Sequence, residues 1–169
     1  MLDLRKETPE VYYLNHAQKY LRFQDCQNLM DFAASSQRNR ARFCAHDNKD
    51  SDIHEMFEVL TSDVYMRPHK QKNKCTSYHL VSGMVNVYLF DNDGQVINSI
   101  VLGEYHSGQK FYCRVPKDVY RMLIPKTDFV LYHETRKGPF DRADTIFAPW
   151  APFENDQCGI DKFMTSLRQ

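Results

Sequence analysis

Two adjacent histidine–glutamate pairs contain the side chains in this sequence best suited to acid–base chemistry. His54 precedes Glu55, and His133 precedes Glu134. An imidazole titrates near neutral pH, and a nearby carboxylate can fix its tautomer and raise its basicity. Because neighbours on a strand point to opposite faces, one residue of each pair is expected to face inward and the other to be structural. All four residues are therefore candidates for catalysis.

A further histidine, His69, lies in the segment RPHKQKNKCTSYHLVSG between Arg67 and Gly83. Side chains two residues apart on a strand share a face, so 69 lies with 71, and 76 lies with 78 and 80. This spacing favours one cluster that contains His69, Gln71 and Thr76. The same alternation predicts that His79 points outward.

The elements that position these residues are mostly strands. Residues 16–36 contain helix formers without Pro or Gly and predict one sizeable helix. A short strand is expected before it, at VYYLN. After Arg42, short apolar runs separated by turn residues predict an antiparallel sandwich or barrel, and Asp93-Gly94 marks a tight hairpin. The expected strands are IHEMFEVL, SYHLVSG, VNVYLF, QVINSIVL, KFYCRV, VYRMLI, FVLYHE and DTIFAP.

The composition argues against nucleic acid and membranes as partners. Lys and Arg total 22 and Asp and Glu total 22 among 169 residues, so no net charge favours a polyanion. The start of the chain is charged, and nowhere do about 18 apolar residues run together. The five cysteines are odd in number and scattered, which favours reduced thiols. We therefore expect a soluble, cytoplasmic, single-domain protein.

Eight short blocks of the sequence match a known family in order and spacing. They are RARFCAH at 40–46, HEM at 54–56, YMRPH at 65–69, LFDNDG at 89–94, FYCRVP at 111–116, HET at 133–135, GPF at 138–140 and FAPWAP at 147–152. Through them the chain resembles the WbuC-like cupin family, which is associated with surface-polysaccharide (O-antigen type) biosynthesis. The resemblance implies one cupin barrel, a jelly roll or double-stranded β-helix, over 40–153. An N-terminal strand and helix extension (1–39) and a C-terminal tail (154–169) would flank it.

The family pattern also implies a metal site, and this chain departs from it. Cupin ligands are three histidines and a glutamate, but the matching positions here hold His69, Gln71, Thr76 and Arg121, the last five residues after Pro116. A guanidinium stays protonated, so it cannot be a ligand and it repels a divalent ion. We therefore predict no cofactor and no tightly bound metal, and a pocket suited to an anion.

Arg121 has two possible orientations and two possible partners. If it faces inward, its charge requires either a structural carboxylate, Glu55 or Glu134, or the carboxylate or phosphate of a ligand. A slip of one residue would instead place Tyr120 inside. Other polar and aromatic side chains either bind ligand or have structural roles. The family pattern places Arg42 and His46 at the barrel entrance. Trp150 either forms the floor of a ligand pocket or packs against other side chains. The ligand-binding candidates are thus Gln71, Thr76, Arg42, His46, Tyr120 and Trp150.

Three functions remain open at this point. The first is a metal-independent isomerase or epimerase of surface-sugar metabolism, in which His69 or His133 is the base and Arg121 stabilises the enolate. The second is a non-catalytic cupin that senses or carries a small anionic, sugar-derived ligand. The third is a metal enzyme with rearranged ligands, His69 with His54 or His133. Cupins commonly pair through barrel faces and terminal strands, so we also expect a homodimer in which VYYLN contributes.

Overall fold

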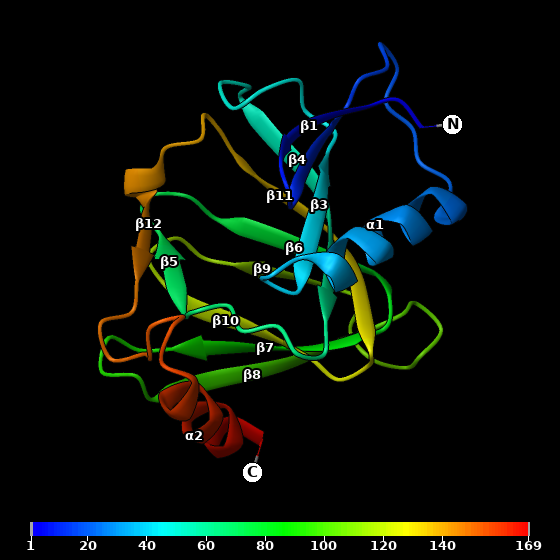
Figure 1. The fold of residues 1–169 in the computed structure, drawn as a ribbon. Helices are drawn as coiled ribbons and strands as arrows, with labels where there is room; N and C mark the ends of the chain where they lie inside the picture. The colour runs from blue at the N-terminus through cyan, green and yellow to red at the C-terminus, as the bar shows by residue number, and fades with distance from the viewer. Residues whose placement is uncertain (1, 169) are drawn as a thin grey trace.

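Two β-sheets face each other in the computed structural model, which describes residues 2–168 (Figure 1). The larger sheet has the order β1-β2-β3-β4-β11-β6-β9 and the smaller the order β12-β5-β10-β7-β8. Neighbouring strands are antiparallel, except that β2 runs parallel to β3. The prediction of a mostly β jelly-roll barrel with an N-terminal helix is confirmed. The strands of the larger sheet are β1 (Leu4–Thr8), β2 (Val11–Leu14), β3 (Arg40–Cys44), β4 (Ile53–Thr61), β6 (Thr76–Ser82), β9 (Tyr112–Val115) and β11 (Phe129–Lys137); those of the smaller are β5 (His69–Gln71), β7 (Met84–Phe90), β8 (Val96–Gly103), β10 (Tyr120–Pro125) and β12 (Thr145–Phe147).

Each of the eight expected apolar runs contains a strand, and the β7–β8 hairpin turns where predicted. Gly94 in that turn has φ +89°, and a Cβ there would lie 2.8 Å from the ring of Trp150. Glycine is therefore required at this position by both conformation and space. Three strands were not expected from the sequence, namely β1, β3 and β5.

The N-terminal segment joins the larger sheet of its own chain. Strand β2, which is the VYYL expected to pair with a second subunit, lies between β1 and β3. Both of its edges are thus occupied, and β1 is the outer strand of this sheet. The homodimer itself remains a prediction.

Each sheet carries one helix on its outer face (Figure 1). Helix α1 (Phe23–Ser35), shorter than the expected 16–36, packs Leu29 and Ala33 against Phe43 of β3. Helix α2 (Gln157–Arg168) was expected only as a tail that wraps the barrel or frays. It packs Ile160 against the outer face of the smaller sheet and covers residues of β7 and β10. A one-turn helix, η1 (Arg142–Asp144), precedes β12.

An apolar core fills one part of the interior between the sheets. Its members are buried and most come from strands of both sheets, for example Leu60 of β4, Val130 of β11 and Leu123 of β10. The alternation of each strand directs these residues inward and their neighbours toward the helices. The polar residues of the same inner faces lie at the other end of the interior.

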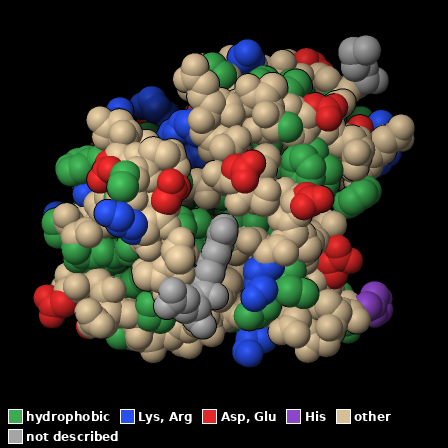
Figure 2. Space-filling model, turned by 60° about the horizontal axis from the view of Figure 1, so that its bottom comes forward, with side chains coloured by type: hydrophobic (Ala, Val, Ile, Leu, Met, Phe, Trp, Pro, Cys, Tyr) green, Lys and Arg blue, Asp and Glu red, His purple; other side chains and the backbone are tan. Residues whose placement is uncertain are grey.

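The outer surface has no strong charge bias on the face shown in Figure 2, where Lys and Arg side chains are interspersed with Asp and Glu. This agrees with the equal totals of basic and acidic residues. Among the described residues, no helix has the length and apolar character that crossing a membrane requires.

Candidate functional site

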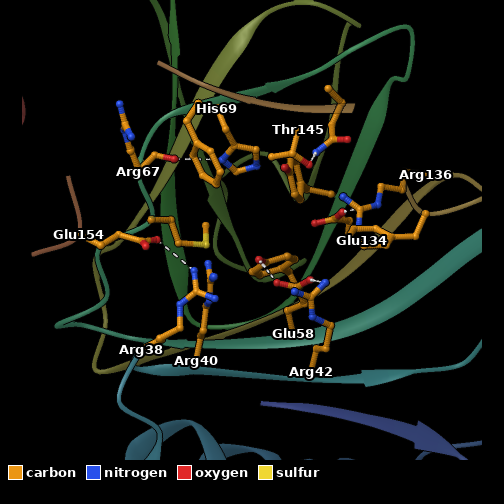
Figure 3. A pocket seen from close by; sticks show the side chains of 16 residues that line it. Arg38, Arg40, Arg42, Glu58, Arg67, His69, Glu134, Arg136, Thr145 and Glu154 are labelled. Carbon is orange, nitrogen blue, oxygen red and sulfur yellow. Dashed lines mark hydrogen bonds and ion pairs between the residues drawn. The ribbon is translucent and has the colours of Figure 1, made fainter. Parts of the chain in front are cut away.

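A cavity of about 140 Å³ lies between the two sheets, at the polar end of the interior (Figure 3). Strands β3, β4, β6 and β11 of the larger sheet form one side, and β5 and β12 form the other. Arginines and glutamates dominate its wall. The lining side chains are Arg38, Arg40, Arg42, Glu58, Met66, Arg67, His69, Gln71, Tyr78, Tyr132, Glu134, Arg136, Phe140, Thr145, Phe147 and Glu154.

An ion pair between a partly exposed arginine and a buried carboxylate is part of a contact across three neighbouring strands on one side of this cavity. Arg42 of β3 lies opposite Glu58 of β4, and Glu58 lies opposite Tyr132 of β11. Arg42 Nη1 is 3.3 Å from Glu58 Oε1, and the Tyr132 hydroxyl donates to Glu58 Oε2 at 2.9 Å. Burial raises the pKa of Glu58, but Arg42 and Arg40 outweigh it and hold that pKa below its usual value. Glu58 is therefore a fixed anion of the structure.

A second carboxylate, Glu134 of β11, has the opposite tendency. Its Oε1 is 3.7 Å from Arg136 Nε, and its side chain is buried. Burial, and then the charge of Glu58, raise the pKa of Glu134. Two nearby carboxyl groups whose pKa values are pushed apart can divide acid and base roles between them.

Arg40 has a half-buried cationic side chain that is near Glu58 but makes no ion pair with it. No hydrogen bond or ion pair to its guanidinium is found within residues 2–168, whereas neighbouring Arg38 pairs with Glu10 at 3.5 Å and Glu154 at 3.0 Å. Burial and the charges of Arg38 and Arg42 lower the pKa of Arg40. The lining thus holds more cationic than anionic side chains, with Arg40 directed into it (Figure 3).

His69 of β5 presents a neutral imidazole to the cavity. Its Nδ1 lies 3.1 Å from the carbonyl oxygen of Arg67, and because a carbonyl only accepts, Nδ1 carries the proton. Burial and the charge of Arg121 lower the pKa of His69 to about 3. Its Nε2 is therefore an unprotonated nitrogen that can accept a hydrogen bond or a proton.

Arg121 faces inward, as predicted, and is 2% exposed. Its partners differ from both expected carboxylates, because Nε donates to the Tyr78 hydroxyl at 3.1 Å and Nη2 to Thr76 Oγ1 at 3.0 Å. Arg121 and His69 are direct partners across β10 and β5. Arg121 thus lies behind the side chains that line the cavity. Its positive charge affects the cavity by lowering the pKa of His69.

The four positions of the family's metal site do lie together, but their chemistry does not fit a metal ion. Arg121 donates a hydrogen bond to Thr76, and the amide of Gln71 donates one to Thr145 Oγ1 at 2.9 Å. His69 is then the one side chain of the four with an imidazole or carboxylate to offer. Among the described residues, no group of three or more His, Cys, Asp and Glu is arranged to hold a metal.

Two of the predicted catalytic residues, His133 and Glu55, lie outside the barrel. His133 Nε2 is 3.8 Å from Glu55 Oε1, and its ring stacks on Phe57 with centroids 4.7 Å apart. Strand alternation explains the error, because Glu134 takes the inward position of its pair and His54 that of the other. A base at His133 and a metal set of His69 with His133 are therefore wrong.

His54 and His46 do face inward but lie away from His69. Their rings stack with centroids 4.0 Å apart, and both line a separate cavity of about 310 Å³. His54 Nε2 is 3.2 Å from the Lys49 carbonyl. A metal set of His69 with His54 is therefore also wrong.

Tyr120 and Trp150 are part of a packed cluster and not of the cavity. Tyr120 precedes Arg121 on β10 and so points to the opposite face. There its ring packs against that of Trp150, with the two ring centroids 5.8 Å apart. Both lie with Phe90 under α2. The interpretation of Trp150 as packing is correct, and neither residue lines a ligand cavity.

Several cavity residues were missed from the sequence, above all Arg40, Glu58 and Arg136. A signal for the first was present in RNRAR, where arginines at 38, 40 and 42 alternate and Ala41 and Phe43 are apolar. This is the pattern of a strand with one polar inner face. Glu58 and Arg136 share the parity of His54 and Glu134 on their strands, so they face inward with them, but alternation alone does not say which parity is the inward one.

Comparison with known proteins identifies the fold and leaves the activity open. A family model described as a domain of unknown function (DUF6016) matches residues 21–102. No curated protein matches. Protein SO0799 from Shewanella oneidensis is similar in structure (TM-score 0.50, 17% identity, 61% of this chain and 66% of that one). So is CapF from Staphylococcus aureus, a capsular polysaccharide assembling protein (TM-score 0.50, 13% identity, 63% of this chain and 32% of that one).

The chain thus spans about two thirds of SO0799 and one third of CapF. A second CapF structure, with the inhibitor 3-isopropenyl-tropolone, gives a TM-score of 0.51 at 14% identity over 64% of this chain and 31% of that one. With the two facing sheets, these likenesses show a cupin fold. The matched family model gives no support specific to the WbuC-like family.

Proposed function

We propose that this cupin binds a small anionic sugar derivative in the arginine-lined cavity and that Arg40 is its anchor. The observation that carries the proposal is the half-buried guanidinium of Arg40, which makes no hydrogen bond or ion pair among the described residues. A buried cation without a partner is costly, and a ligand carboxylate or phosphate that pairs with it bidentately removes that cost.

The cavity has room for about one sugar ring. Its volume of about 140 Å³ is close to that of a cavity which accepts one benzene molecule, ~150 Å³. His69 Nε2 supplies an acceptor for a sugar hydroxyl, and the rings of Phe140 and Phe147, 46% and 44% exposed, supply apolar faces. A charged sugar therefore matches the polarity of the lining, and its six-membered ring without the substituents matches the size.

The biological setting we propose is surface-polysaccharide metabolism. The resemblance to WbuC-like cupins suggests it, and the structural likeness to CapF, a capsular polysaccharide assembling protein, is in keeping with it. Sugar acids and sugar phosphates are reagents of that metabolism, and both carry the anion that Arg40 would bind.

Isothermal titration calorimetry with D-glucuronate, glucose 1-phosphate and neutral glucose tests the binding. We expect at least one of the two anions to bind and glucose not to bind. Arg40→Met should weaken that binding 10- to 100-fold, the equivalent of one charge-assisted hydrogen bond, about 1.5–3 kcal/mol. Arg114→Met, at an exposed arginine of β9, is the matched control and should leave the affinity unchanged. No binding of either anion, or equal binding by the Arg40 variant, would refute the proposal.

A metal-independent isomerase or epimerase is the catalytic form of this proposal. The base would be His69 Nε2, which is unprotonated but weakly basic because burial and Arg121 lower its pKa to about 3. Glu134, whose pKa is raised by burial and by Glu58, can donate a proton on the same cavity. Incorporation of deuterium from solvent into the bound sugar, lost in His69→Gln, is the expected result. Binding without exchange would instead support a non-catalytic ligand-binding cupin.

A further inference from the structure

A second cavity, of about 310 Å³, lies next to the first. Arg42, Arg136 and Phe140 line both cavities, so these three side chains form the boundary between them. Figure 3 shows Arg42 and Arg136 together on one side of the first cavity. The interior therefore offers two adjoining compartments with cations where they meet.

The strands explain why the two compartments adjoin. On β3, inward side chains pass from Arg40 in the first cavity through Arg42 at the boundary to Cys44 in the second. On β11 they pass in the same way from Glu134 to Arg136. Four residues along a strand, from 40 to 44, span about 14 Å, so a ligand that pairs with Arg40 and reaches the second compartment must have about that length.

The second compartment differs from the first in chemistry. Its walls are mostly apolar and aromatic, with Tyr13, His46, His54 and Met56 all buried, while the charged Glu7 and Lys49 also contribute to its lining. Burial lowers the pKa of His46 and lowers that of His54 to about 4, so both rings are neutral near pH 7. Neutral rings and aliphatic side chains suit a flat, uncharged group.

Resting on the function proposed above, we propose that the second compartment binds a planar aromatic group attached to the anionic sugar. The ligand would place its anion at Arg40 and its sugar in the first cavity beside His69. Its aromatic ring would pass Arg42 and Arg136 and lie against Tyr13, His46 and Phe140. The substrate class is then an anionic sugar linked to an aryl or heteroaryl group, and not a free sugar acid. A volume of about 310 Å³ is twice that of a cavity that accepts one benzene, ~150 Å³.

The test compares D-glucuronate, 4-nitrophenyl β-D-glucuronide and octyl β-D-glucuronide by calorimetry on the full chain. We expect the nitrophenyl compound to bind at least about tenfold more tightly than glucuronate, and more tightly than the octyl compound. Thr8→Trp, which fills the second compartment from the exposed strand β1, should abolish that gain and leave glucuronate binding unchanged. Val11→Trp, on β2, is a second filling variant, and Lys126→Trp, at an exposed position outside both cavities, is the control.

The outcomes separate this inference from the proposed function. Glucuronate binding that depends on Arg40, with no gain from the nitrophenyl group, overturns the inference alone. An equal or larger gain from the octyl group, or a gain that survives both filling variants, overturns it as well. If none of the three compounds binds, the inference is overturned together with the glucuronate arm of the proposed function.

Discussion

The apolar end and the arginine-lined end of the barrel interior are built from the same strands. On β4, Leu60 belongs to the apolar core, Glu58 to the ion pair with Arg42, and His54 to the second compartment. On β11, Val130 belongs to the apolar core and Glu134 lines the first cavity. Parity therefore decides which side chains face inward, while position along the strand decides whether they stabilise the fold or line a cavity.

The two ends should differ in how the loss of a side chain affects stability and ligand binding. At the apolar end, truncation leaves a void and costs stability without affecting a ligand. At the polar end, the effect depends on whether the side chain is already paired inside the protein. Arg42 forms an ion pair with Glu58, whereas Arg40 forms none among the described residues, so these two arginines of one strand provide the sharpest contrast.

Removal of Arg42 should give the largest loss of stability. Arg42→Met leaves the Glu58 carboxylate buried without its cation, at a cost of about 3–5 kcal/mol in the free energy of unfolding. Urea denaturation measures this cost, and it should shrink at acid pH, where Glu58 becomes protonated. A loss below about 1 kcal/mol would show that the pair is not a structural one.

Truncation at the apolar end should be nearly as costly but neutral for binding. Leu60→Ala removes a fully buried side chain and should lower the free energy of unfolding by about 2–5 kcal/mol. The affinity for D-glucuronate or glucose 1-phosphate should stay within about twofold of that of the unaltered protein. A large loss of affinity in a variant that still folds would contradict the separation of the two ends.

Acid should destabilise the polar end through its neutral histidines. His69 has a folded-state pKa of about 3, below the unfolded value near 6.5, so the unfolded chain binds more protons as the pH falls from 6.5 toward 3. His69 should therefore cost on the order of 1–2 kcal/mol of stability at pH 5. Glu134, whose pKa is raised, works in the opposite direction.

The variant His69→Gln isolates the histidine's contribution to this pH dependence. Thermal or urea unfolding at pH 7 and pH 5 should show a smaller acid loss in the variant than in the unaltered protein. Equal losses in the two proteins would mean that His69 is not held neutral by burial and Arg121.

The smallest effects are expected on the outer face of the same strands. His133 and Glu55 lie 3.8 Å apart, and the glutamate side chain is 52% exposed. His133→Gln and Glu55→Gln should each change stability by less than about 1 kcal/mol and leave ligand affinity unchanged. A measurable loss of ligand affinity in either variant would show that the outer face contributes to ligand binding.

Most of the fold could be predicted from the sequence because its strands are apolar runs bounded by turns. All eight expected runs became strands, and the inward orientation of Arg121 followed from its distance to Pro116. The missed strands had weaker signals. β1 (LRKET) and β3 (RARFC) are rich in charge, and β5 (HKQ) has three residues, so none has an apolar run.

The site was harder to predict because its parts come together only through sheet pairing. The sequence placed His69, Gln71, Thr76 and Arg121 together correctly, since a family pattern supplied the spacing. It could not show that hydroxyls of Thr76 and Tyr78 bind Arg121, nor that β3 would bring Arg40 to the same cavity. Adjacent candidates such as His133 and Glu134 required the register of β11, which alternation alone does not give.

The central claim is that Arg40, which makes no ion pair among the described residues, binds the anion of a ligand. A crystal structure with bound ligand tests this claim most directly. Crystals soaked with D-glucuronate or glucose 1-phosphate should show the carboxylate or phosphate within hydrogen-bonding distance, about 2.7–3.0 Å, of the Arg40 guanidinium. The sugar ring should lie between His69 and the rings of Phe140 and Phe147. A ligand bound elsewhere, or an Arg40 side chain that finds a protein carboxylate in the crystal, would contradict the account.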